Sequence, residues 1–139
     1  MGPDGSAGPP SSFTLRRERR QPTALEAALG AVGSAPWSAA ALSLGNLLAL
    51  GGARKRLRGY PSVMQCTWYT GIFAASAVAL HTGDTTNGSG LAAAWSAIWL
   101  FFNARNAYRA PARQPKLLIG LHLLNGLPYA YKYAAGGRE

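Results

Sequence analysis

The sequence predicts an all-α membrane protein, a multi-pass bundle of about four short transmembrane helices. Three observations lead to this prediction: long uncharged apolar runs, clusters of cations between the runs, and small residues spaced by four within them. A membrane span needs about 20 mostly apolar residues, and a soluble helix of that length normally carries a charged face. The uncharged runs cover residues 27–53, 59–83, 85–104 and, more briefly, 117–131.

The charge balance is basic, with 14 Lys and Arg residues against 5 Asp and Glu residues and a net charge of +9. The cations fall in three clusters, within residues 16–20, 54–58 and 105–116. A nucleic-acid-binding domain would carry its cations on one face of a soluble fold. Clusters that flank apolar segments are typical of the positive-inside rule. We therefore expect the lipid bilayer as a partner, and no nucleic acid.

Composition divides the chain into four parts. Residues 1–21 form a basic tail rich in Gly, Pro and Ser that we expect to be disordered. Its Arg-rich part resembles a mitochondrial targeting segment, with a juxtamembrane anchor as the alternative. Residues 22–34 are a candidate interfacial helix, with Thr23 and Glu26 in the positions of a capping box. Residues 35–134 hold the four-helix transmembrane domain, and residues 135–139 a frayed C-terminus.

Helices are expected over residues 36–50, 60–80, 91–102 and 116–133. Gly51 and Gly52 should end the first helix. A glycine-rich neutral turn over residues 81–90 should join the second helix to the third. Pro111 and Pro115 should prevent the third and fourth helices from forming one continuous helix. The predicted pattern is therefore two hairpins, each with a basic loop.

Small residues recur every four positions in three of these helices. In lipid, such strips let helices approach closely and pack by dispersion. They could serve packing within the bundle, contact with other membrane proteins, or contact with a second copy of the chain. The strips are Ala41, Gly45 and Ala49, then Gly71, Ala75 and Ala79, then Ser89, Ala93 and Ala97.

Four polar side chains fall inside the predicted spans: Asn46, Gln65, His122 and Asn125. Because a polar group in the bilayer must find a partner, hydrogen bonds between helices are expected. His122 is the ionisable side chain inside a span, which raises a functional hypothesis. A proton path usually needs a carboxylate partner as well, and no predicted span contains one.

No catalytic, cofactor-binding or metal site is predicted, and we expect no enzymatic activity. The single cysteine, Cys66, excludes an intramolecular disulfide and a cysteine-based zinc site. His81 and His122 are too far apart in sequence, and lack the further ligands that a metal site needs. The motifs of a nucleophile elbow, an acid pair and a phosphate-binding loop do not occur in the sequence.

The segment from Asn87-Gly88-Ser89-Gly90 to Trp95-Ser96-Ala97 resembles the fungal altered-inheritance-of-mitochondria protein nineteen family. The similarity covers residues 87–129, roughly the C-terminal half. Ala94 stands where the fungal pattern has Thr, and the basic loop that follows is stronger here. The resemblance implies a small multi-pass protein of a mitochondrial membrane, and it offers no catalytic residues.

Two functions compete at this point. The first is a structural or accessory role in the mitochondrial membrane, most simply the inner one. The second is a small channel or carrier that uses His122 and the buried amides. A four-span protein of the endomembrane system is a weaker alternative.

Charge predicts the topology. Residues 54–58 and 105–116 carry four cations each and the central turn carries none, so both basic loops should face the matrix, or the cytosol in an endomembrane. The central turn and both termini should lie on the other side. The cations of residues 16–20 oppose this orientation unless they belong to a targeting signal or lie far enough from the first helix.

Overall fold

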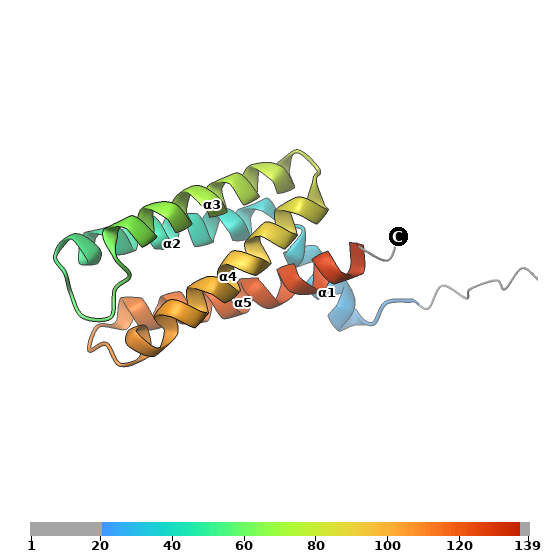
Figure 1. Cartoon of the computed structure of the whole chain (residues 1–139). Helices are drawn as coiled ribbons and strands as arrows, with labels where there is room; N and C mark the ends of the chain where they lie inside the picture. Colours follow the sequence, from blue (N-terminus) through green and yellow to red (C-terminus); the bar gives the residue numbers. More distant parts are fainter. Residues whose placement is uncertain (1–20, 137–139) are drawn as a thin grey trace, which may run out of the picture.

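The structure is a computed structural model that describes residues 21–136. These residues form five helices and no strand (Figure 1). The helices are α1 (Ala24–Gly33), α2 (Pro36–Arg54), α3 (Val63–His81), α4 (Thr85–Tyr108) and α5 (Arg113–Gly136). The all-α prediction is confirmed for this part of the chain. Most of the predicted disordered tail, and residues 137–139 of the predicted frayed end, lie outside the described residues.

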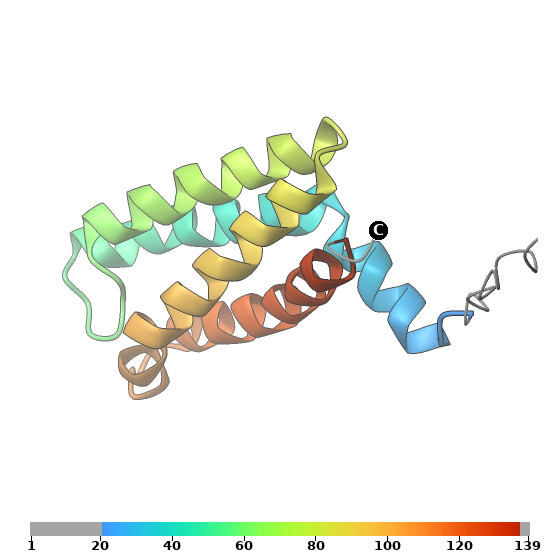
Figure 2. The same cartoon turned by 45° about the vertical axis from the view of Figure 1, so that its right-hand side comes forward.

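Helices α2 to α5 form an up-and-down four-helix bundle. Each packs on the next along the chain, and α5 also contacts α2, which closes the bundle. Helix α1 meets α2 at a bend of 57° and packs on α5 (Figure 2). Pro36 stands at the start of α2, where its missing N–H costs nothing. Thr23 and Glu26 form the predicted capping box at the start of α1.

Two of the predicted helix ends were wrong because glycine was interpreted as a turn residue. Helix α2 runs through Gly51 and Gly52 to Arg54. Helix α4 begins at Thr85, so the central turn is much shorter than predicted and Gly88 and Gly90 are helical. A Cβ on Gly88 would lie 2.7 Å from the Cγ atom of Leu80. Gly88 therefore serves the close approach of α3 and α4.

The second half of the bundle is also longer than predicted. Helix α4 continues to Tyr108, and α5 begins at Arg113 with Pro115 in its first turn, a position that tolerates proline. Helix α5 extends to Gly136, into the region that was expected to fray. The loop between them is correspondingly short, and two hairpins result, as the charge pattern predicts.

Burial in the bundle is unusual, because several polar side chains share the interior with the apolar core while many large apolar side chains lie outside. Phe73, Trp99 and Tyr129 are the largest fully buried side chains. The buried polar side chains are Ser38, Asn46, Ser76, Ser89, Ser96, Asn103, His122 and Asn125. The exposed large apolar side chains of α2 to α5 include Leu44, Leu47, Leu48, Met64, Trp68, Val78, Phe101, Phe102, Leu117, Leu123, Leu124 and Leu127.

Adding a methyl group should have opposite effects at two helical glycines. Gly88→Ala should destabilise the protein by about 1–3 kcal/mol, because the new Cβ would overpack against Leu80. Gly71→Ala should stabilise it by about 0.5–1 kcal/mol, since nothing lies within 4 Å of its Cβ position and alanine favours the helix. Thermal unfolding of both variants under the same conditions tests this. Equal shifts would contradict close packing at Gly88.

The start of α4 should respond to pH through Asp84. Its carboxylate accepts hydrogen bonds from the side-chain and backbone N–H groups of Asn87, at 2.8 and 3.1 Å, and these bonds lower the pKa of Asp84. The stabilisation of the folded state by these two hydrogen bonds is therefore complete above the unfolded-state pKa of about 3.9. It is lost as pH falls through the folded-state pKa.

Asp84→Asn keeps a capping oxygen but does not titrate. Any stability advantage of the wild type over this variant should therefore shrink as pH falls from about 7 to about 3. Melting temperatures of both proteins across that range measure the effect. A difference that stays constant with pH would rule out the titrating cap.

Candidate functional site

The centre of the bundle holds a histidine that contacts all three neighbouring helices of the bundle. The ring of His122 on α5 stacks on Trp99 of α4, with centroids 4.2 Å apart and planes 13° apart. Phe73 of α3 lies against the same ring at 5.3 Å. The Nδ2 atom of Asn46 on α2 lies 3.4 Å from Nε2 of His122. All four side chains are fully buried, as the sequence predicts for His122 and Asn46.

Unpartnered polar atoms gather around this histidine. Oδ1 of Asn46, Oγ of Ser96, Nε1 of Trp99 and Nδ1 of His122 are buried and have no hydrogen-bond partner within the described chain. Ser96 and His122 also line a cavity of about 170 Å³ between α4 and α5, whose other walls are apolar. Buried polar groups are normally paired. This polar cluster could therefore bind a small hydrogen-bonding molecule.

The cluster has no partner for acid–base chemistry. The acidic residues of the described chain are Glu26 and Asp84, and both lie outside α2 to α5, at the end where α1 and the α3–α4 turn lie (Figure 1). Among the described residues, no group of three His, Cys, Asp or Glu side chains could hold a metal ion. His81 is exposed at the end of α3 and does not join His122. Cys66 is a free, buried thiol.

Gln65 and Asn125 form local hydrogen bonds, and not bonds between helices as expected. Gln65 is half-buried and closes the capping box at the start of α3, where its Oε1 accepts the backbone N–H of Ser62 at 3.0 Å. The side-chain amide of Asn125 donates to the carbonyl of Leu121, one turn earlier, at 2.7 Å. Asn46 also donates to its own helix, at 2.9 Å, but its contact with His122 joins α2 to α5, as expected.

Buried polar residues on α4 and α5 follow a repeat of seven, and the sequence analysis missed Ser96 and Asn103 among them. On α4, Ser89, Ser96 and Asn103 are buried at this spacing, and on α5, His122 and Tyr129 are. Buried positions three and four residues apart are typical of a helix seam packed in the coiled-coil manner. That spacing was a usable signal, but a search for apolar periodicity overlooks it because the residues at these positions carry polar groups.

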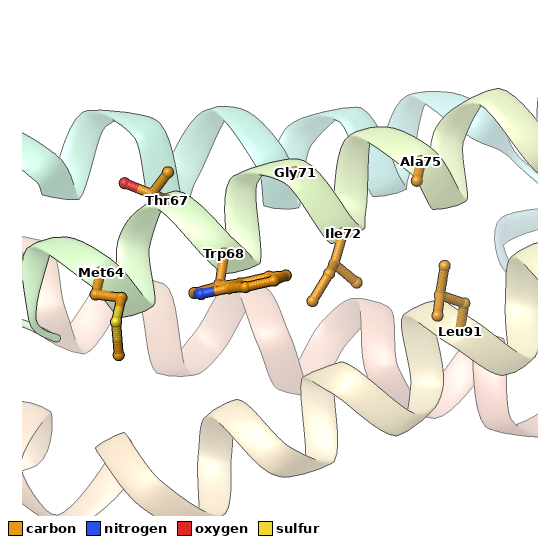
Figure 3. Close-up of a pocket in the computed structure, with 7 residues that line it drawn as sticks. All are labelled: Met64, Thr67, Trp68, Gly71, Ile72, Ala75 and Leu91. Atoms are coloured by element: carbon orange, nitrogen blue, oxygen red, sulfur yellow. The ribbon is translucent and has the colours of Figure 1, made fainter.

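The small-residue strips do not all face the same way. Gly45 faces α5, where a Cβ would lie 2.9 Å from a Cδ atom of Leu121. Gly71 and Ala75 are instead exposed on α3. Together with Met64, Thr67, Trp68, Ile72 and Leu91 they line an outward-facing groove of about 580 Å³ (Figure 3). The α3 strip is therefore not used for packing inside the bundle.

The two basic loops lie together at one end of the bundle (Figure 1). Gly59 adopts a φ of 90° and lies so close to the second loop that a Cβ would overlap that of Ala110. The hydroxyl of Tyr60 donates to Oε1 of Gln114 at 2.8 Å. The eight exposed cations of this basic end are Arg54, Lys55, Arg56, Arg58, Arg105, Arg109, Arg113 and Lys116.

Helix length and composition bear on membrane crossing. Among the described helices, α3 alone is long and apolar enough to cross a membrane on its own. The bent pair of α1 and α2 also meets the criterion when its two helices are taken together. One or two spans therefore qualify by this measure.

Comparison with known proteins identifies the family. A family model described as altered inheritance of mitochondria protein 19 matches residues 30–134. An altered inheritance of mitochondria protein 19 homolog from Schizosaccharomyces pombe is 35% identical over 77 residues, which is 55% of this chain and 65% of that protein. No solved structure matches the chain. The match reaches well before residues 87–129, where the resemblance was noted, and the chain belongs to the altered inheritance of mitochondria protein 19 family.

Proposed function

We propose that the protein is a multi-pass integral protein of the mitochondrial inner membrane, with a structural or accessory role and no enzymatic activity. The observation that carries this proposal is the burial pattern of the bundle, in which polar side chains share the interior with the apolar core while many large apolar side chains face outward. Soluble monomers rarely expose extended apolar surface. A bilayer would cover the outer side chains, and the polar ones would be kept from lipid by the neighbouring helices.

Helix dimensions agree with this proposal. Helices α2 and α3 have 19 residues each, or about 28 Å at 1.5 Å per residue, close to the hydrocarbon thickness of about 30 Å. Trp37, Tyr108 and Tyr133 are exposed near helix ends, where aromatic side chains suit the membrane interface. The basic end would then lie at one surface of the membrane.

The modest apolar character of α2, α4 and α5 has a structural reason. Composition counts every face of a helix, whereas lipid would contact only the outer one. Asn46, Asn103 and His122 lower the hydropathy of their helices, but all three are buried in the bundle. Weak hydropathy is therefore compatible with four spans.

The mitochondrial location is inferred from the name of the S. pombe relative, and an endomembrane location is the alternative. We propose an accessory role because α3 exposes a surface suited to contact with another membrane helix. An accessory protein needs a contact surface. Gly71 and Ala75 offer a strip on α3 that another membrane helix, or a second copy, could approach closely.

Topology gives the decisive test. In a Cys66→Ser background, cysteines at Thr82 and Lys55 probe the two ends of the bundle, because both positions are exposed. In mitoplasts with intact inner membranes, an impermeant maleimide should label Thr82→Cys at once, and Lys55→Cys only after detergent is added. Labelling of both positions without detergent would show that the bundle does not span.

A channel or carrier remains the second candidate, favoured by the unpartnered polar atoms around His122. We expect the reconstituted protein to show no proton or potassium flux above that of protein-free liposomes, because Glu26 and Asp84, the acidic residues of the described chain, both lie outside helices α2 to α5. His122→Phe is the matched variant, since it keeps a ring against Trp99 and Phe73. Flux in the wild type that His122→Phe abolishes would overturn the accessory role.

A further inference from the structure

We propose that a groove between α2 and α5 binds an anionic phospholipid, with an acyl chain along the groove and the phosphate at Lys116. The proposal rests on the membrane location argued above. It names the chemistry of a ligand that neither the family nor the accessory role specifies. Two independent features meet at this place: an apolar groove and a concentration of positive charge.

The groove has a volume of about 440 Å³ and is lined mainly by leucines. Gly120 of α5 leaves the groove open, because nothing lies within 4 Å of its Cβ position, and Gly45 of α2 lets α2 approach Leu121 at the base of the groove. Leu48, Leu117 and Leu124 are exposed along it. From Lys116 to Leu124 the helix rises about 12 Å, which suits a stretch of acyl chain.

Lys116 and Gln114 line the groove where it reaches the basic end. Lys116 is exposed, and the described acidic residues, Glu26 and Asp84, lie toward the opposite end of the bundle (Figure 1). The bond between Tyr60 and Gln114 holds the two basic loops together beside it. The local electrostatic potential is therefore positive. Acidic lipid headgroups bind in basic pockets between membrane helices.

The larger groove on α3 does not share these properties. Its lining residues, shown in Figure 3, include no charged side chain. Free phosphate would gain nothing from a leucine-lined groove, and a neutral lipid would gain nothing from Lys116. The coincidence of both features favours a lipid with an anionic headgroup.

The test uses the full chain in phosphatidylcholine nanodiscs, with phosphatidylglycerol of the same acyl chains as the anionic probe. Native mass spectrometry measures lipid that the protein retains, and a titration of fluorescent phosphatidylglycerol measures affinity. Phosphatidylglycerol should be retained in preference to phosphatidylcholine. Lys116→Gln should weaken binding by about fivefold, the effect of about one interfacial cation.

Gly120→Leu should weaken binding by at least as much, because its side chain would fill the groove. Nothing lies within 4 Å of the Cβ position of Gly120, so the variant should fold, and its melting temperature verifies this. Two matched controls should leave binding unchanged. Gly71→Leu places the same side chain at an equally open position on α3, and Lys55→Gln removes one cation of the basic end outside the groove.

Three results would overturn the proposal in a protein that labelling shows to be inserted. Equal losses in Lys55→Gln and Lys116→Gln would indicate a diffuse charge effect. Full binding by Gly120→Leu would exclude the groove. Competition by glycerol phosphate as effective as that of the lipid would indicate a site for the headgroup alone. Failure of insertion would instead be seen in the labelling experiment, and would reject the membrane proposal.

Discussion

The bundle depends on polar side chains whose hydrogen bonds are satisfied inside the protein, either within their own helix or on a helix that they touch. Asn103 and Asn125 donate to the carbonyl one turn earlier in the same helix. Ser76 of α3 donates to the carbonyl of Gly88 on α4 at 2.7 Å, where the two helices touch. Such residues can occupy a buried seam without the desolvation cost of an unpaired group. The polar interior is therefore compatible with tight packing.

The surroundings of His122 differ from the rest of this buried seam in their hydrogen bonding. The buried serines and asparagines are mostly paired, but the atoms left unpaired, on Asn46, Ser96, Trp99 and His122, converge on one place. Unpaired buried atoms are costly. A bundle that satisfies most of its polar groups and leaves four of them together has one region whose chemistry is not explained by packing alone. The unexplained polarity is confined to the middle of the bundle.

Prediction from sequence succeeded where charge was the signal. The uncharged runs and basic clusters located four helices and paired the loops at 54–58 and 105–116. Prediction from sequence failed at Gly88, because a glycine can serve either a turn or a close contact between helices. The contact with Leu80, which shows that Gly88 serves packing, is visible only in the structure. Sequence analysis also missed Ser96 and Asn103, and it assigned Ser89 to a small-residue strip and not to the polar seam. Apolar periodicity cannot find a seam whose inner residues are partly polar while many outer residues are apolar.

Charge and packing meet at the basic end. Eight cations there repel one another, and the loops that carry them are held together by neutral contacts: Gly59 against Ala110, and Tyr60 with Gln114. Repulsion between exposed charges is weak beyond about 10 Å in salt, so two neutral contacts can hold the loops. An anionic surface would lower the repulsion further. The arrangement is therefore more favourable beside acidic headgroups than in water, and orientation in a membrane and stability of the loops would depend on the same charges.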